Sequence, residues 1–159
     1  MAVRTYAPVG KTPILRVPLT RDHISVIGAL TPEGRLFVQT QYHSYKGEDV
    51  VGFLKQLLRQ IPGKLLIIWD GSPIHRCEAV KTFLRRGGAE RIHLERMPAY
   101  APELNPQEGV WNLLKRCELK NRCCKDLSQL DYELLLARAR LRHRKQTLRQ
   151  CFAYAGYSL

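Results

Sequence analysis

The chain contains 159 residues, of which 45% are hydrophobic and 25% charged, and it carries a formal net charge of +12. This length and composition fit one domain with a buried core, and they exclude a disordered, collagen-like or coiled-coil protein. No apolar run approaches the roughly 20 residues that a membrane-spanning helix needs, and the first residues lack the apolar stretch of a signal peptide. We therefore expect a single domain over residues 1–159, located in the cytoplasm and without a membrane partner.

The first half of the chain predicts a hairpin followed by a helix. A short strand is expected at Ile14–Val17 and a longer one at His23–Leu30. A turn at Thr31–Gly34, with proline second and glycine fourth, leads into another strand at Leu36–Tyr42. Apolar residues at helical spacing, with two acidic residues in the first turn, then predict an amphipathic helix over Gly47–Ile61.

The middle of the chain predicts two strands separated by a helix. The continuous apolar run Leu65–Trp69 indicates a central strand covered on both faces. A serine cap and a proline at Ser72–Pro73 begin a helix that ends at Gly87–Gly88. Another short strand is expected at Arg91–Met97, and a proline-rich loop follows it over residues 98–106.

The last part of the chain is helical. One helix begins near Asn105, and from about Ser128 the chain is helical and basic as far as Gly156. Strands that alternate with helices after an antiparallel hairpin predict an α/β domain, with one mixed β-sheet flanked by helices.

The positive charge is concentrated in this helical part. Residues 111–150 carry 11 basic and 4 acidic side chains, which gives +7 of the net +12. A polyanion, most simply a nucleic acid, is the partner that such asymmetry suggests, and a basic solvated surface would give the same composition.

Two acidic residues stand where chemistry could occur. Asp70 ends the most apolar strand, and ligands of open α/β sheets bind beyond the carboxyl ends of strands. It could equally cap the turn into the next helix. Glu108 lies in the first turn of a helix, where a capping box with Asn105 would explain it. The stiff proline-rich loop before Glu108 favours a further role, because a rigid loop can fix one carboxylate against another.

The sequence around these acids resembles a known family. Residues Asp70–His75 read D-G-S-P-I-H, and Pro98–Trp111 read P-A-Y-A-P-E-L-N-P-Q-E-G-V-W, with Lys115–Arg116 following. These strings, together with Arg4–Pro13 and Ser25–Leu30, are similar to the catalytic half of DDE-type transposases. The similarity is closer to the bacterial insertion-sequence branch of the mariner superfamily, and it spans at least residues 4–115.

The resemblance implies a ribonuclease-H-like fold and a nuclease that uses two divalent metal ions, Mg²⁺ or Mn²⁺. By position, Asp70 is the second catalytic and metal-binding acid and Glu108 the third, while His75 and Asn105 match supporting positions. Mg²⁺ prefers hard oxygen ligands and keeps several waters. A pair of such ions, about 3.5–4 Å apart, activates the attacking water or 3′-hydroxyl and stabilises the leaving oxygen.

The chain departs from the family pattern at its start. In the family, the first catalytic Asp lies on a first strand upstream of the segment that Arg4–Pro13 matches. The resemblance therefore implies that this acid, the first strand and an N-terminal helix-turn-helix are missing here. We expect little or no strand transfer by the chain alone. An upstream polypeptide could supply the missing Asp, and both a truncated product and half of a split transposase fit the pattern.

The basic helical part is expected to contact DNA phosphates, which would give salt-sensitive binding with weak sequence selectivity. The residues expected to make these contacts are Lys115, Arg116, Lys120, Arg138, Arg142 and Lys145. Spacings of four and three place the last three on one helical face. A solvated amphipathic helix is the alternative explanation, and both can hold.

The sequence therefore predicts DNA transposition, carried out by the endonuclease and strand-transfer domain of an insertion-sequence transposase. Such a protein would act on double-stranded DNA, at transposon ends and target, as a nucleoid-associated homodimer. Phosphoryl transfer of this kind needs positioning and charge neutralisation rather than a protein nucleophile. The alternatives are another ribonuclease-H-like nuclease, such as a resolvase or an RNA–DNA hybrid nuclease, and a non-catalytic DNA-binding or dimerising remnant.

Overall fold

The computed structural model describes residues 6–11 and 23–158. The elements in chain order are β1 (Ser25–Leu30), β2 (Leu36–Gln41), α1 (Gly47–Gln60), β3 (Leu65–Trp69), α2 (Glu78–Arg85), β4 (Ile92–Arg96), α3 (Pro106–Leu113), α4 (Leu127–Arg142) and α5 (Lys145–Tyr154). A π-helical turn over Leu114–Glu118 extends α3. The strand predicted at Ile14–Val17 lies outside the described residues.

The predicted hairpin is confirmed. Strands β1 and β2 pair antiparallel, with Leu30 opposite Leu36. The turn closes where the Gly34 N–H donates to the Thr31 carbonyl at 2.9 Å. Gly34 has a φ of +77°, a left-handed conformation that favours glycine. A side chain there would also collide with the Lys145 carbonyl, so this turn lies directly against the start of α5.

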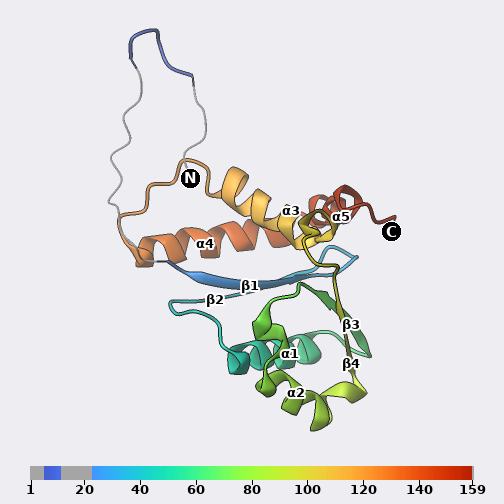
Figure 1. Cartoon of the computed structure of the whole chain (residues 1–159). Helices are drawn as coiled ribbons and strands as arrows, with labels where there is room; N and C mark the ends of the chain where they lie inside the picture. The colour runs from blue at the N-terminus through green and yellow to red at the C-terminus, as the bar shows by residue number, and fades with distance from the viewer. Residues whose placement is uncertain (1–5, 12–22, 159) are drawn as a thin grey trace.

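The prediction of one mixed sheet is wrong for the described residues, which form two separate two-stranded sheets (Figure 1). Strand β3 pairs in parallel with β4, so that Leu65 lies opposite Ile92 and Trp69 opposite Arg96. Within the described ranges, no strand pairs with the remaining edge of β1 or of β3. The hairpin and the parallel pair are therefore held together by side-chain packing rather than by a continuous hydrogen-bonded sheet.

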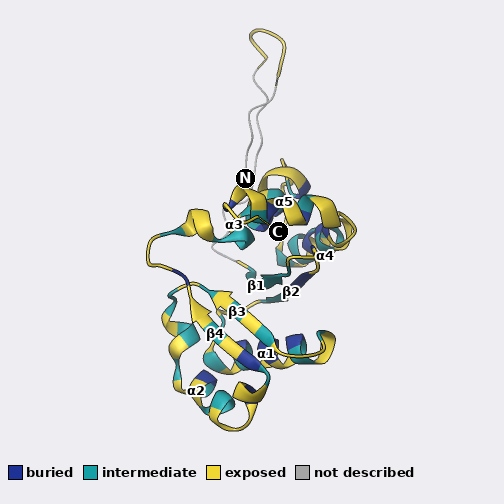
Figure 2. Ribbon diagram, turned by 90° about the vertical axis from the view of Figure 1, so that its right-hand side faces the viewer, coloured by how far each residue is buried: buried dark blue, intermediate teal, exposed yellow. Residues whose placement is uncertain are grey.

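The prediction that both faces of β3 are covered is also wrong for the described chain. Leu65, Ile67 and Trp69 pack into the cluster formed with α1 and α2. Leu66 and Ile68 point the other way and are 62% and 51% exposed, as the alternating colours of β3 show (Figure 2). Successive side chains of a strand lie on opposite faces. Helices cover only one face here, so the continuous apolar run is half exposed.

The hairpin lies between the two helical layers of the molecule (Figure 1). On one face, Leu36 and Val38 join the core formed with α3, α4 and α5. On the other face, Phe37 packs against α1. The three clusters of buried residues are Leu36, Val38, Val110, Leu114, Leu134, Ala137, Leu141, Leu148 and Cys151; Val50, Leu54, Val80 and Ile92; and Phe37, Phe53 and Leu57.

The single helix predicted from Ser72 is divided in two. A 3₁₀ turn at Pro73–Arg76 is followed by an extended Cys77 and then by α2. The Ser72 side chain makes no cap hydrogen bond, although its backbone N–H donates to Asp70. Gly87, with a φ of +103°, follows the end of α2, as the sequence predicted.

The basic C-terminal part is also two helices rather than one. Helix α4 ends at Arg142, and α5 begins at Lys145. The buried Glu118 side chain, 5% exposed, ties α4 to the end of α3, because it accepts from Arg140 Nε at 2.6 Å and lies 3.0 Å from Arg144 Nη1. In the part of the chain that the structure describes, no helix is long and apolar enough to span a membrane.

Candidate active site

Asp70 stands immediately after β3, at the carboxyl end of the strand. Its Oδ1 accepts the backbone N–H of Ser72 at 2.9 Å and lies 3.2 Å from His75 Nε2. The Asp70 side chain is nevertheless 61% exposed. Both contacts involve Oδ1, so the local turn orients the carboxylate and leaves Oδ2 available to a ligand.

His75 lies beside Asp70 and is held by the strand that precedes it. Its ring stacks on Trp69, with the ring centroids 4.4 Å apart and the planes 13° from parallel. Burial lowers the pKa of His75 below its ordinary value, and the nearby Asp70 raises it by a smaller amount. Nδ1 is buried and has no hydrogen-bond partner among the described residues, so a proton there would be unsatisfied. We therefore assign a neutral ring whose Nε2–H donates to Asp70.

Glu108 occupies the first turn of α3, which Asn105 caps. The Asn105 side chain accepts the Gln107 N–H at 3.0 Å. The Asn105 backbone N–H donates to the Pro102 carbonyl at 3.0 Å. The predicted capping box is therefore wrong, because the N–H that Glu108 would accept has another acceptor. The exposed Glu108 carboxylate is not used by the cap, and the positive end of the helix dipole favours its charge.

Asp70 and Glu108 line one hollow of about 410 Å³. The hollow lies where the parallel strands β3 and β4 both end. Its wall is the loop 98–102, which connects β4 to the turn before α3 and includes Tyr100 in a left-handed conformation, with a φ of +56°. The structure thus brings Asp70 into the same hollow as Asn105 and Glu108, which the sequence placed on a separate element.

Arg96 also lines this hollow, and the sequence reasoning missed it. Its guanidinium lies against Gly71, where an added Cβ would be 2.6 Å from Nη2. The sequence contained a signal for this residue, because Arg96 lies at the end of the second parallel strand, as Trp69 does at the end of the first. A guanidinium beside two carboxylates can bind the phosphate oxygens of a substrate.

The donor set of the hollow fits a hard divalent cation. Carboxylate oxygens are the protein ligands that Mg²⁺ accepts, and the ion keeps several waters in its octahedral shell. Across residues 6–11 and 23–158, no group of three or more His, Cys, Asp or Glu side chains is close enough to hold a metal. Asp70 and Glu108 could therefore hold an ion whose other positions are filled by water, by substrate or by a further acid.

Five of the six predicted DNA-binding residues are exposed, in two groups. Lys115 and Arg116 are exposed on the π-helical turn, and the exposed Lys120 follows it. Arg142 and Lys145 are exposed at the junction of α4 and α5, where they line a second hollow.

Arg138 stands apart from this surface. It is half-buried, its Nε has no partner among the described residues, and burial lowers the pKa of its guanidinium. The single helical face predicted for Arg138, Arg142 and Lys145 is wrong, because α4 ends at Arg142 and Lys145 belongs to the next helix.

Comparisons with known proteins agree on the class of fold. The sequence profile of the family described as DDE superfamily endonuclease matches residues 2–131. No curated protein sequence matches the chain significantly. Among solved structures, the crystal structure of the Mos1 strand transfer complex is similar, with a TM-score of 0.62 and 15% identity. The match covers the whole of this chain and 51% of the Mos1 chain.

Two further Mos1 structures give the same picture. The Mos1 mariner paired end complex with Mn has a TM-score of 0.62 and 14% identity, and the match covers the whole of this chain and 52% of the Mos1 chain. The catalytic domain of Mos1 mariner transposase has a TM-score of 0.55 and 13% identity, over 87% of this chain and 82% of its own. The chain thus spans about half the length of the proteins in the two complexes, and it shares the mixed α/β fold of the catalytic domain.

Proposed function

This chain belongs to the DDE superfamily of endonucleases, and from this premise we propose that it is the catalytic part of a mariner-like insertion-sequence transposase. The membership confirms the resemblance that the motifs at Asp70–His75 and Pro98–Trp111 predicted. The observation that carries the proposal is the single hollow lined by Asp70 and Glu108. In a transposase, such a site cuts a phosphodiester at the element end and joins the freed 3′-hydroxyl to target DNA.

Four polar residues that line the hollow, together with His75 beside it, have roles in this chemistry. Asp70 and Glu108 would hold the divalent ions through their oxygens, and two bound Mg²⁺ or Mn²⁺ ions would activate the attacking hydroxyl and stabilise the leaving oxygen. The neutral His75 donates to Asp70 and keeps its carboxylate oriented. Asn105 fixes the first turn of α3, and therefore the position of Glu108. Arg96 would neutralise charge on the substrate phosphate.

We further propose that the first acid of the triad comes from an upstream polypeptide, as a strand between β1 and β3 that completes a ribonuclease-H-like sheet. Two observations support this. One edge of β1 and one edge of β3 have no strand partner within the described residues. The Gln107 amide is buried with both polar atoms unpaired in that same part of the chain, and it packs against Gly28 of β1, where an added Cβ would lie 2.8 Å from Nε2. Buried amides normally have partners, which an inserted backbone would supply.

The proposed partners are transposon ends, target DNA and a second copy of the chain, in the nucleoid of the cytoplasm. The names of two similar structures describe a strand transfer complex and a paired end complex. The net charge of +12 supports binding to a polyanion.

Binding of Mn²⁺, followed by isothermal titration calorimetry, tests the metal site. We expect Asp70→Asn and Glu108→Gln each to weaken Mn²⁺ binding at least tenfold. Glu48→Gln, which removes an exposed acid from the first turn of α1, should leave binding unchanged. Wild-type affinity in both site variants would refute the assignment.

Cleavage of an end-labelled duplex tests the missing acid. The purified chain with Mg²⁺ should cleave little or not at all, and addition of an upstream polypeptide carrying the first Asp should restore cleavage. Robust Mg²⁺-dependent cleavage by the chain alone, abolished by Asp70→Ala, would overturn this part of the proposal.

A non-catalytic DNA-binding or dimerising remnant is the second candidate. It is favoured by the finding that the described residues bring no third metal-binding side chain to the hollow. A remnant should bind DNA equally well with and without Mg²⁺, whereas a metal-loaded site should bind its DNA ends more tightly with the ion. A strand-transfer assay with defined ends separates the transposase from other ribonuclease-H-like nucleases, against which the proline-rich loop before Glu108 argues.

A further inference from the structure

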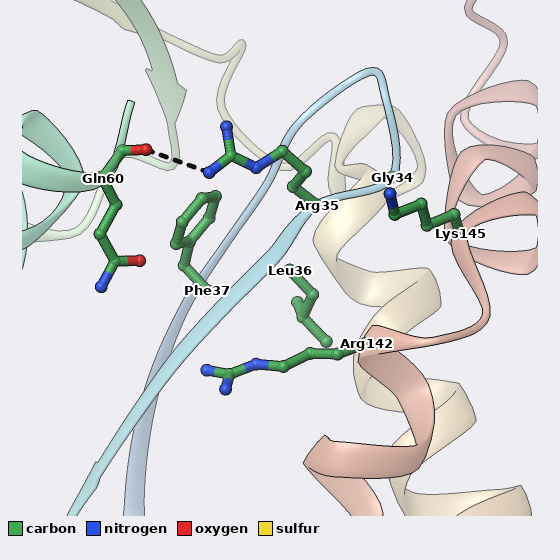
Figure 3. A pocket seen from close by; sticks show the side chains of 7 residues that line it. All are labelled: Gly34, Arg35, Leu36, Phe37, Gln60, Arg142 and Lys145. Carbon is green, nitrogen blue, oxygen red and sulfur yellow. Dashed lines mark hydrogen bonds between the residues drawn. The ribbon is translucent and has the colours of Figure 1, made fainter. Parts of the chain in front are cut away.

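A second hollow, of about 270 Å³, lies beside the hairpin turn and shares no residue with the hollow of Asp70 and Glu108. Figure 3 shows the cationic side chains entering it from two directions, Arg35 from the hairpin and Arg142 and Lys145 from the α4–α5 junction. The residues that line it are Gly34, Arg35, Leu36, Phe37, Gln60, Arg142 and Lys145. Three are cations and none is an acid, which is the composition of an anion site.

Arg35 is held in place before any ligand arrives. Its Nη2 donates to the Gln60 carbonyl at 3.0 Å, as the dashed line in Figure 3 marks, and its guanidinium carbon lies 5.2 Å from the centre of the Phe37 ring. A guanidinium has five N–H donors, so one bond to Gln60 leaves others for a ligand. A side chain that is already ordered loses less conformational entropy on binding.

Arg142 and Lys145, like Arg35, have no acidic partner in an ion pair of the described residues. Their neighbours Arg140 and Arg144 both bind the buried Glu118. The break between α4 and α5 brings Arg142 and Lys145 to the hairpin, where the close contact of Gly34 with the Lys145 backbone sets their distance from the turn. Both side chains line the hollow, and no acidic residue lines it.

The hairpin supplies a main-chain donor as well. The Thr31 N–H donates to the Arg35 carbonyl at 3.0 Å and the Arg35 N–H donates to the Thr31 hydroxyl at 3.3 Å, so this pair lies at a hydrogen-bonding position of the hairpin. Hydrogen-bonded and non-hydrogen-bonded pairs alternate in an antiparallel ladder. Leu36, the next residue, is therefore in a non-hydrogen-bonded pair with Leu30, and its N–H points away from β1 toward the open edge of β2 that borders the hollow.

One acid flanks the hollow without lining it. Glu33 precedes Gly34 in the turn, and the pKa of its carboxyl is lowered chiefly by a hydrogen bond with Thr31, with smaller contributions from Arg35 and Arg149. The Glu33 carboxylate therefore interacts with Arg149 on α5 as well as with Arg35. When Glu33 and Arg149 are counted with the residues that line the hollow, the net charge around it is still positive.

We propose that this hollow binds a phosphate group of a DNA backbone, at a place separate from the reacting phosphodiester. Guanidinium and ammonium groups on opposite sides of one space match the acceptor oxygens of a phosphate. The hollow would hold a flanking stretch of duplex while the carboxylates act elsewhere. The choice of DNA as the source of the phosphate rests on the proposed function, whereas the anion site itself rests on the geometry.

Fluorescence anisotropy with a labelled 20-base-pair duplex of arbitrary sequence, in EDTA, tests the proposal. The pocket variant carries Arg35→Gln, Arg142→Gln and Lys145→Gln. The control variant loses the same charge from exposed lysines outside the hollow, through Lys55→Gln, Lys64→Gln and Lys81→Gln. The pocket variant should bind about tenfold more weakly than the wild type, the loss expected for one charge-assisted contact. The slope of log K against log salt concentration should also fall by about 0.9.

Equal losses in the pocket and control variants would overturn the proposal, because they would show a general effect of net charge. Absence of duplex binding by the wild type would overturn it too, as would chemical-shift changes at Gly34–Phe37 that inorganic phosphate causes and the duplex does not. If the triple variant unfolds, Arg142→Gln with Lys145→Gln keeps the Arg35–Gln60 bond and gives the same readout. Because no metal is present, failure here leaves the Mn²⁺ test of Asp70 and Glu108 unaffected.

Discussion

The exposed apolar face of β3 allows a sharp test of the fold, with the double variant Leu66→Thr, Ile68→Thr. Threonine is β-branched, so the substitutions keep the strand propensity of these positions while removing most of their apolar surface. If both side chains face water in this chain, little burial is lost.

The size of the effect follows from the exposed fractions. Full burial of a Leu or Ile side chain contributes about 1.5–3 kcal/mol. Leu66 is 62% exposed and Ile68 is 51% exposed, so roughly two-fifths and one-half of that amount are present. Because threonine retains a methyl group, the double variant should lose about 1–2 kcal/mol of unfolding free energy. Leu54→Ala, at a position that is 2% exposed, should lose about 2–5 kcal/mol.

Urea unfolding followed by far-UV circular dichroism, at two protein concentrations, gives both values. Leu54→Ala serves as the reference for a buried leucine on the covered side of β3. A loss in the double variant equal to that of Leu54→Ala would refute the reasoning, because it would mean that another surface covers this face. If that loss also grew with protein concentration, the cover would be a second copy.

Three further predictions concern single residues. Arg140→Ala should lower the unfolding free energy by about 1.5 kcal/mol, because the buried Glu118 loses its charge-assisted hydrogen bond from Arg140 and keeps only the ion pair with Arg144; a thermal melt that does not change would contradict this. Asn105→Ala should cost about 1 kcal/mol through loss of the α3 cap and should also weaken Mn²⁺ binding, whereas a stability change without a binding change would separate Asn105 from the site. The pKa of His75 is lower in the folded than in the unfolded chain, so its contribution to stability is complete above about pH 6.5 and is lost as the pH falls toward the folded pKa. His75→Gln should flatten the dependence of stability on pH between about 7 and 5, and an unchanged profile would count against the assignment.

Features that depend on neighbouring residues were predicted well from the sequence. The turn from Thr31 to Gly34 and the end of α2 near Gly87 follow from glycine and proline preferences that act within a few residues. The side-chain cap from Asn105 follows in the same way, because the donor and acceptor lie two residues apart. The position of Asp70 at the carboxyl end of a strand was likewise evident before the structure.

Features that depend on distant packing needed the structure. An apolar run specifies a buried strand but not how many neighbours it has, so the exposed face at Leu66 and Ile68 was not foreseen. Arg35 and Arg142 line the same hollow because α4 ends against the hairpin, since hydrophobic burial brings together surfaces regardless of their separation along the chain. Backbone preferences act over a few bonds, whereas a site is assembled by contacts between elements that the chain connects only through long paths.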